Sequence, residues 1–126
     1  MSFSNYLENK VMLHVFGGTS YTAPATLYVG LYTSDPGEDD TGTEVSGGSY
    51  ARQTAAFTIT GGAAANTAAI EFPTASASWG TVTYVGVRDA STGGNLLASG
   101  ALTTSKTISS GDVFRIPAGD LDITLD

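Results

Sequence analysis

The sequence has no cysteine and only one histidine, His14. The absence of cysteine excludes disulfide bonds, thiolate metal sites and a cysteine nucleophile, but leaves the redox compartment open. One histidine is too few for an ordinary zinc site, and a Ser-His-Asp triad would have to use His14. That residue lies in a short amphipathic segment, where a partly buried or interfacial histidine is the ordinary interpretation. We therefore expect no catalytic, cofactor-binding or metal-binding residues, and no enzymatic activity.

Charged side chains are also scarce, at 13% of the 126 residues, whereas about 25% is typical of globular domains. The formal net charge is −7, and the five basic residues are scattered along the chain. Nucleic acids and anionic membranes attract clusters of lysine and arginine, so we expect neither as a partner. A surface rich in threonine, serine, alanine and glycine suits a β-protein partly covered by other proteins. The alternative is that threonine and serine alone keep the protein in solution.

Long apolar runs are missing, so the sequence predicts neither a signal peptide nor a transmembrane helix. We therefore expect synthesis in a cytoplasm. The length favours one domain with one modest core. We expect residues 1–126 to form that domain, with a helical arm at 1–18 and a β-sandwich at 25–126.

Alternation with a period of two is the main positive signal. In residues 25–33, the aliphatic side chains of Leu27, Val29 and Leu31 alternate with two tyrosines and a glycine. Such a period predicts a strand with an aliphatic face and an amphipathic face. Residues 81–89 repeat the central Tyr-Val-Gly. We expect these two segments to be central, neighbouring strands of one sheet.

Other short apolar segments are bounded by glycine or proline, which cannot continue a strand ladder. We place strands at residues 51–60, 66–72, 96–102 and 113–116, with a C-terminal strand carrying Leu121, Ile123 and Leu125 on one face. Residues 103–110 are polar, and Gly111-Asp112 follows them as a turn. Seven or eight strands with regular turns indicate a mainly β fold: an antiparallel β-sandwich, jelly-roll-like, with one short N-terminal α-helix. The predicted core includes Leu27, Val29, Leu31, Phe57, Ile70, Val85 and Val87.

Residues 1–18 contain the predicted helix. Asn5 as N-cap and Glu8 three residues later resemble a capping box. Gly17 and Gly18 supply a C-cap that can adopt a positive φ. The apolar stripe consists of Phe3, Leu7, Val11 and Val15. A helix of about three turns with such a stripe should pack on a sheet edge or on a neighbouring subunit.

Residues 35–44 hold five of the twelve acidic residues. A solvated loop is the ordinary interpretation of this cluster. A Ca²⁺ site is the alternative, since hard cations bind carboxylate oxygens, but the spacing differs from that of an EF-hand loop. Glu71 and Asp89 can be imagined as paired carboxylates. Each lies near a strand end, however, and nothing in the sequence links them.

Eight segments carry a resemblance that spans nearly the whole chain: residues 4–10, 25–33, 42–53, 72–75, 78–83, 93–97, 100–103 and 113–126. Together they resemble a family of small virion proteins of tailed bacteriophages, commonly labelled phage tail fibre proteins. The resemblance implies a structural role in the virion and synthesis in the cytoplasm of a bacterial host. It also implies other virion proteins, capsid or tail subunits, as partners, and it offers no catalytic motif.

Two questions stay open at this point. Similar-sized β-sandwich proteins also serve as capsid cement or decoration proteins, so both tail and capsid placements fit. A carbohydrate- or receptor-binding module is a further alternative, with a host-surface glycan as partner. Its stacking side chains would be Tyr28, Tyr32, Tyr50 and Trp79, although core or interface packing is their more ordinary use. We expect a homo-oligomer or docking on virion subunits through these contacts: Phe3, Tyr6, Leu7, Val11, His14, Tyr28 and Tyr32.

Overall fold

The computed structural model describes residues 1–124, which form ten strands and one helix. In chain order they are β1 (Ser2–Phe3), α1 (Asn5–Val15), β2 (Leu27–Tyr32), β3 (Gln53–Ala55), β4 (Phe57–Thr60), β5 (Ala63–Asn66), β6 (Ile70–Glu71), β7 (Gly80–Arg88), β8 (Leu96–Ile108), β9 (Arg115–Ile116) and β10 (Asp122–Thr124). The predicted mainly β fold with antiparallel sheets and one short N-terminal helix is confirmed. The predicted apolar position at Leu125 lies outside the described residues.

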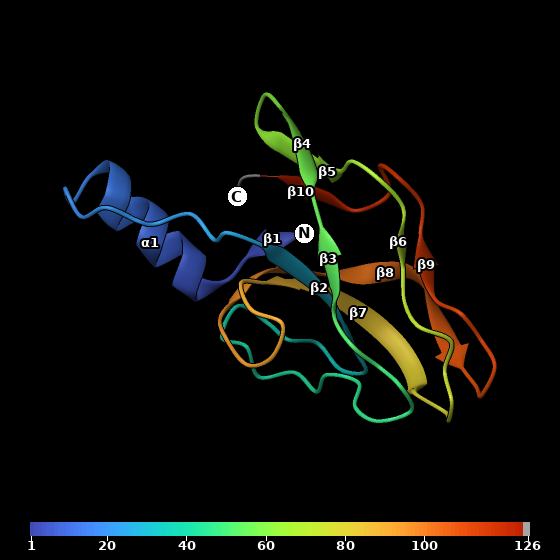
Figure 1. Cartoon of the computed structure of the whole chain (residues 1–126). Helices are drawn as coiled ribbons and strands as arrows, with labels where there is room; N and C mark the ends of the chain where they lie inside the picture. The colour runs from blue at the N-terminus through green and yellow to red at the C-terminus, as the bar shows by residue number, and fades with distance from the viewer. Residues whose placement is uncertain (125–126) are drawn as a thin grey trace.

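The central sheet has five strands in the order β1-β8-β7-β2-β3, and neighbouring strands are antiparallel (Figure 1). β2 and β7 lie side by side in its middle, as predicted, with Gly30 opposite Gly86. A Cβ atom on Gly86 would lie only 2.8 Å from Cε1 of Tyr32 and 2.9 Å from Cδ1 of Leu96. Glycine at this position therefore leaves room for the Tyr32 ring and the Leu96 side chain beside the backbone of β7.

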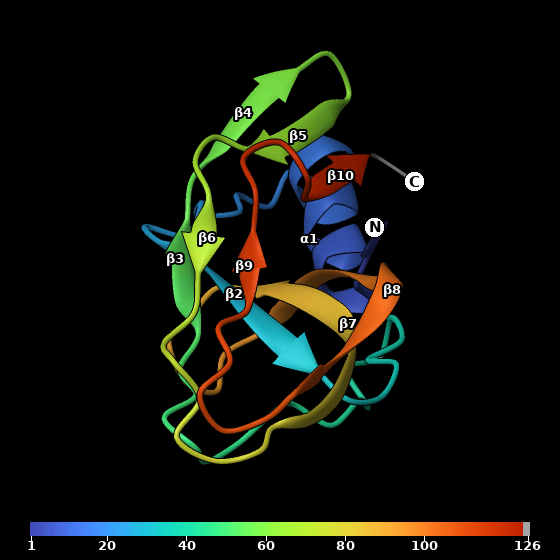
Figure 2. The ribbon, with the colours of Figure 1, turned by 90° about the vertical axis from the view of Figure 1, so that its right-hand side faces the viewer.

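Two smaller sheets complete the fold. β4 and β5 form a hairpin, and β10 pairs with β5 to give the order β10-β5-β4. β6 and β9 form a two-stranded ladder in which Ile70 is opposite Ile116. Figure 2 shows this ladder standing in front of the central sheet, with the β4–β5 hairpin above it.

One hydrophobic core joins side chains from the central sheet, the β6–β9 ladder and the loops between them. Five of the seven predicted core residues are buried, namely Val29, Leu31, Ile70, Val85 and Val87. The other two, Leu27 and Phe57, are partly buried and pack against the same core. Trp79 is buried as well, and its Nε1–H donates a hydrogen bond to the carbonyl of Gly48 at 2.8 Å.

The helix occupies the predicted segment, but its cap differs. Ser4, not Asn5, is the N-cap, because its side chain accepts a hydrogen bond from the Leu7 N–H at 3.1 Å. The helix ends at Val15, with Phe16 as its C-cap, just before the predicted glycines. Gly18 has a positive φ of 71°, and the Thr19 N–H donates a hydrogen bond to the carbonyl of Leu13.

Three strand predictions are corrected. The predicted strand at 51–60 is divided into β3 and β4 at Ala56. The predicted strand at 66–72 contains β6 and only the last residue of β5, which lies in an alanine-rich segment with little β-propensity. β8 continues to Ile108, beyond the predicted strand end at residue 102. These residues are rich in threonine, which favours strands and suits an exposed edge.

Candidate assembly surface

The start of α1 is fixed to the central sheet. The Ser4 N–H donates a hydrogen bond to the carbonyl of Leu97 on β8 at 2.7 Å, and the Asn5 N–H donates to the carbonyl of Glu38 at 2.8 Å. Ser4 is only 3% exposed, so its capping hydroxyl is shielded from solvent. The direction of the helix is therefore set by buried contacts at its first turn.

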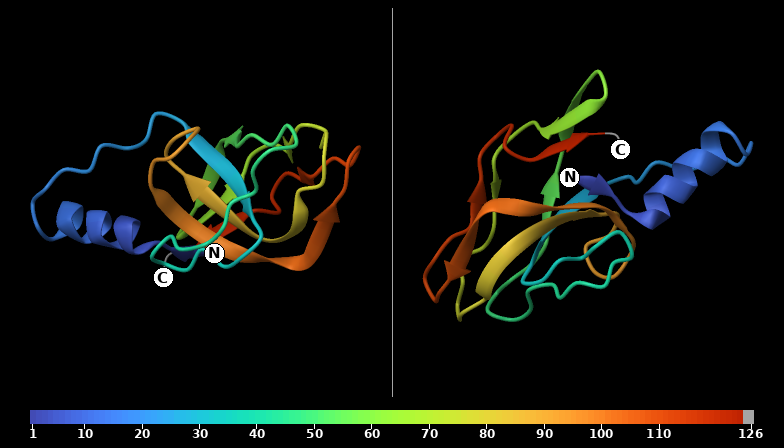
Figure 3. Two further views of the ribbon diagram at one scale, coloured as in Figure 1. Left: turned by 90° about the horizontal axis from the view of Figure 1, so that it is seen from below. Right: turned by 180° about the vertical axis from the view of Figure 1, so that it is seen from behind.

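From this fixed start, α1 extends away from the sheets, as Figures 1 and 3 show. No residue of the helix is buried. Its last turns expose four large apolar side chains, which we call the helix end: Met12 (57% exposed), Leu13 (37%), Val15 (60%) and Phe16 (79%). Only His14 is polar among residues 11–16. A helical segment that is apolar on most sides is normally enclosed by other protein.

A second apolar feature lies beside the first turn of the helix. It is a cleft of about 200 Å³, lined only by apolar residues from the helix and from strands of the central and β10-β5-β4 sheets. We call it the apolar cleft. Its lining includes Leu7, Leu27, Phe57, Ile59, Val87 and Ile123. Ile59 is 68% exposed, so one wall of the cleft is open to solvent.

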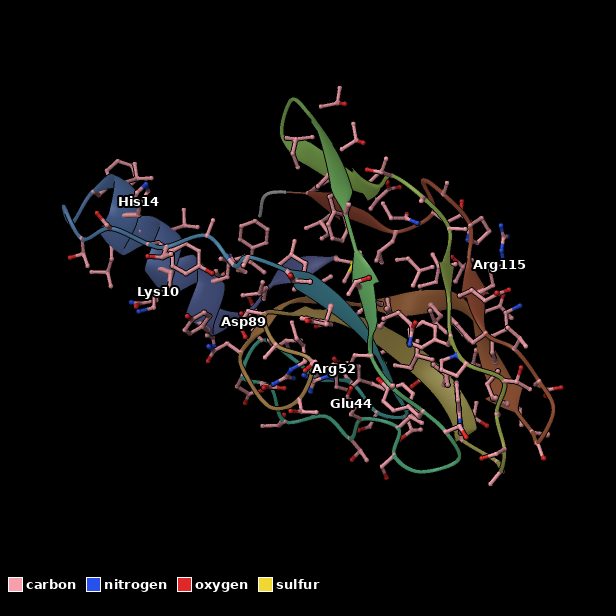
Figure 4. All side chains as sticks on the ribbon, viewed as in Figure 1. Lys10, His14, Glu44, Arg52, Asp89 and Arg115 are labelled. Carbon is pink, nitrogen blue, oxygen red and sulfur yellow. The ribbon has the colours of Figure 1, made fainter. Side chains whose placement is uncertain are left out.

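The basic side chains of the helix are Lys10 and His14 (Figure 4). The Lys10 ammonium is 5.5 Å from the ring centroid of Tyr6, which is a cation–π distance. His14 is exposed, and its Nδ1 accepts a hydrogen bond from the Tyr21 N–H at 3.2 Å. His14 thus helps to hold the connection that follows the helix.

A polar cluster lies around Glu44, away from the helix (Figure 4). The two carboxylate oxygens accept hydrogen bonds from Arg52 at 2.7 and 2.8 Å, and one of them also accepts from the Tyr50 hydroxyl at 2.6 Å. Burial alone would raise the pKa of Glu44, but these hydrogen bonds outweigh it and lower the pKa below 4.5. Burial, and then the hydrogen bond to Glu44, raises the pKa of Tyr50. The carboxylate is therefore charged and the phenol neutral at neutral pH.

A second ion pair joins Arg88 and Asp40. Both Arg88 terminal nitrogens donate to the Asp40 carboxylate at 2.8 Å, and one also donates to the Tyr32 hydroxyl at 3.0 Å. Burial opposes the charge of Arg88, but the bonds to Asp40 and Tyr32 outweigh it and raise its pKa. Two of the five acidic residues of the 35–44 loop thus bind arginines, so the interpretation as a solvated loop holds for only part of it.

Within residues 1–124, no group of three or more acidic or histidine side chains is placed to hold a metal ion. Glu71 lies on β6 opposite Arg115, whereas Asp89 follows β7 and accepts hydrogen bonds from Asn95. The two carboxylates considered as a pair thus have separate neighbours. In the same part of the chain, no helix is long and apolar enough to cross a membrane.

Two of the four aromatic residues considered for sugar stacking, Tyr50 and Trp79, pack against each other. The Tyr50 ring stacks on Phe72 at 6.1 Å and meets Trp79 edge-on at 5.4 Å. Tyr32 is 1% exposed. Of the four candidates, only Tyr28 is neither buried nor engaged in this aromatic packing.

The model of the family described as podophage GP4 fiber I protein gp80 matches residues 2–124. The chain belongs to this phage fibre family. It is thus a structural component of the virion, in agreement with the resemblance drawn from the sequence. None of the curated proteins matches this fibre protein.

The fold brings together part of the predicted set of assembly contacts. Phe3, Tyr6, Leu7 and Val11 lie half-buried on β1 and the first turns of α1, and His14 is exposed. Tyr28, on β2, is half-buried in the central sheet. Tyr32 is buried, so we do not include it in any proposed surface.

Sequence reasoning missed Met12, Leu13 and Phe16, because it followed the stripe spaced by four residues. The available signal was the apolar content of residues 11–16 as a whole.

Proposed function

We propose that this fibre protein is a non-enzymatic component of the phage fibre, and that it attaches to other virion proteins through the helix end. The single observation that carries the proposal is the exposure of four large apolar side chains on an element that projects from the sheets. Exposed apolar patches of this kind are typical of protein–protein contact sites. Membership of a fibre family favours this placement over a capsid cement role.

The size of the effect agrees with an assembly contact. Burying one large apolar side chain contributes about 1.5–3 kcal/mol. Enclosing the helix end, with exposures between 37% and 79%, would therefore contribute on the order of 3–7 kcal/mol. Association itself costs at least about 4 kcal/mol in lost motion. One such contact is weak, but a virion repeats it many times, and repetition strengthens binding.

The polar clusters support a structural role. The Glu44 carboxylate is engaged by Arg52 and Tyr50, and Asp40 is engaged by Arg88. An acid or base must reach a substrate to act on it, and these groups are turned toward each other. The packing of Tyr32, Tyr50 and Trp79 likewise gives no support to a carbohydrate-binding role.

The test is incorporation into particles. Deleting residues 1–16 would remove β1 and the Ser4 cap along with the helix, so a point substitution is sharper. Phe16→Ser changes a side chain that is 79% exposed and should leave the fold intact. Val113→Ser is the matched control, because Val113 is 47% exposed and lies before β9.

We expect phage that supply only the Phe16→Ser chain to carry at least about tenfold less of it per particle, as one weakened contact of about 1.4 kcal/mol would produce. The Val113→Ser chain should be incorporated normally. Normal incorporation of a folded Phe16→Ser chain would contradict the proposal.

A further inference from the structure

We propose that the ion pair between Asp40 and Arg88 is a lock that fixes the direction of the projecting helix, and that breaking this pair frees the helix without unfolding the sheets. The lock itself is inferred from the fold alone, whereas its value for assembly rests on the proposed function. It gives a conformational role to two side chains that lie outside the helix.

The first turn of α1 is attached on two sides. On one side, the Ser4 N–H donates a hydrogen bond to the carbonyl of Leu97 at 2.7 Å, and the Ser4 hydroxyl donates to the carbonyl of Leu96, both on β8. On the other side, the Asn5 N–H donates to the carbonyl of Glu38 at 2.8 Å. No residue of the helix is buried, so these three bonds largely determine where it points.

The ion pair ties the two attachments together. Asp40 follows Glu38 by two residues, and each of its carboxylate oxygens accepts a hydrogen bond from Arg88 at 2.8 Å. The same guanidinium donates to the carbonyls of Gly93 at 3.3 Å and Gly94 at 3.1 Å, in the turn that leads into β8. One buried arginine thus holds both the loop that carries one attachment and the turn that precedes the other.

The lock acts on the tip of a tight turn. Pro36 is buried, and its carbonyl accepts a hydrogen bond from the Thr41 N–H at 2.8 Å, which closes the base of this turn. The tip, residues 37–40, is joined to other elements through the bond from Asn5 and the bonds from Arg88. The position of the tip therefore decides whether the bond to the helix can form.

Asp40 also has a strained backbone. Its φ is 60°, in the left-handed region that residues other than glycine seldom adopt. Such a conformation persists where surrounding contacts impose it, and the two bonds from Arg88 are such contacts. The Asp40 side chain is 35% exposed, whereas that of Arg88 is 8% exposed, so the pair opens from the side of the loop. Once the pair opens, relaxation of Asp40 carries the Glu38 carbonyl away from the helix.

Hydrogen exchange of the full chain, read by NMR at the Ser4 and Asn5 amides, tests the lock. Asp40→Asn removes the charge but keeps a side chain of the same shape that tolerates the left-handed conformation. Glu44→Gln is the matched control, because it makes the same carboxylate-to-amide change in the same loop, in an ion pair that is not bonded to the helix base. Denaturant unfolding, followed by the fluorescence of Trp79, gives the global stability of each variant.

We expect Asp40→Asn to speed exchange at the Ser4 and Asn5 amides by at least about tenfold, because a hydrogen bond to a charged group contributes at least that factor. Amides in the middle of β2 and β7 should exchange as in the unmodified chain, once the difference in global stability is allowed for. On the same basis, Glu44→Gln should leave the Ser4 and Asn5 amides unchanged.

Energy transfer measures the direction of the helix. The chain has one tryptophan, Trp79, and no cysteine, so Phe16→Cys gives a unique attachment point for an acceptor dye on the helix end. Time-resolved transfer from Trp79 to the dye then yields a distribution of distances. We expect a narrow distribution in the otherwise unmodified chain and with Glu44→Gln, and a broader one with Asp40→Asn.

A second substitution, Asn5→Pro, removes one attachment directly. Asn5 is the first helical residue, a position that proline favours, and Ser4 has a ψ of 160°, which suits a residue before proline. The variant should therefore keep the helix, lose the bond to Glu38 and broaden the distances. Adding Asp40→Asn to Asn5→Pro should broaden them little further, because the attachment that the lock controls is already gone. Such non-additivity is the sign of coupling between the two sites.

Four results would overturn the lock: an unfolded Asp40→Asn chain, a folded one with unchanged exchange and distances, an equal effect of Glu44→Gln, or additive effects of Asp40→Asn and Asn5→Pro. Any of them leaves the proposed function standing, because that function depends on the incorporation of Phe16→Ser. A lock that passes these tests, together with normal incorporation of Phe16→Ser, would instead contradict the proposed function alone.

Discussion

Replacing Glu44 tests whether the polar cluster on the central sheet holds the fold together. Glu44→Ala removes a carboxylate that accepts two hydrogen bonds from Arg52 and one from the Tyr50 hydroxyl, all between 2.6 and 2.8 Å. The Arg52 side chain is only 7% exposed, so water cannot replace the lost partner fully. Arg52 would keep its bonds to the carbonyls of Ala90 and Gly93.

The magnitude follows from the burial of the two partners. Removing one member of a fully buried ion pair typically costs about 3–5 kcal/mol. Glu44 is 23% exposed, so part of this cost is relieved by solvent, and we expect Glu44→Ala to lower the free energy of unfolding by about 2–4 kcal/mol. Glu44→Gln keeps an acceptor but loses the charge, and should cost less, about 1–2 kcal/mol.

Denaturant unfolding measures these values directly. Trp79 is the only tryptophan and is 4% exposed, so its fluorescence reports the transition without labelling. Glu38→Ala is the control, because Glu38 is an exposed acid of the same loop and should change stability by less than about 0.5 kcal/mol. A loss below about 1 kcal/mol in Glu44→Ala would refute the view that this cluster stabilises the fold.

The same cluster predicts a pH dependence. The pKa of Glu44 is lower in the folded chain than its ordinary value of 4.5. The unfolded state therefore binds more protons near and below that pH, and stability falls as pH falls. The contribution of Glu44 is complete above pH 4.5 and is lost as pH drops toward the folded pKa. Glu44→Gln should reduce the slope of stability against pH in this acidic window and leave it unchanged near pH 7.

Two further predictions concern the core and the assembly contact. Val29→Ala removes two methyl groups from a side chain that is 0% exposed, and should lower the free energy of unfolding by about 1–3 kcal/mol in the same assay; an unchanged midpoint would show that the site repacks. The dissociation constant of self-association should change by less than about tenfold between low and high salt, because screening acts mainly on charge pairs and one surface pair contributes at most about 1 kcal/mol. Loss of self-association at high salt in ultracentrifugation would show that charges dominate the interface.

The central strands could be predicted from the sequence because their signals are local. Leu27, Val29 and Leu31 alternate with two tyrosines and a glycine, and that period predicts the burial of the aliphatic face. β5 and the far half of β8 could not be predicted in this way. β5 consists of three alanines and an asparagine, and it exists because β4 and β10 pair with it on both sides. β5 is therefore a strand because of its tertiary pairing, and local β-propensity does not predict it.

The assembly surface was predictable only in outline. The stripe of Leu7, Val11 and Val15 indicated a helix that needs a docking surface, and the structure places that helix away from the sheets. The stripe could not indicate that Phe16 would be the most exposed large apolar residue of the described part of the chain, because its exposure depends on how the backbone of Ser4 is bonded to the central sheet. The cleft was hidden for a related reason: Ile59 and Ile123 come from strands that meet only through pairing with β5.

The pairing of basic residues within the chain affects how copies of the protein can attract one another. Arg52 and Arg88 each bind an acidic residue of the chain itself, so two of the five basic side chains are withdrawn from the surface. These internal pairs leave the net charge of −7 unchanged, and like charges of this size oppose close approach of two copies over about one Debye length. Attraction between virion subunits must then come from short-range apolar contact, for which the described residues offer their largest exposed side chains at the helix end. An acidic surface with one apolar projection would keep free chains apart at low concentration and let them join where the virion holds them side by side.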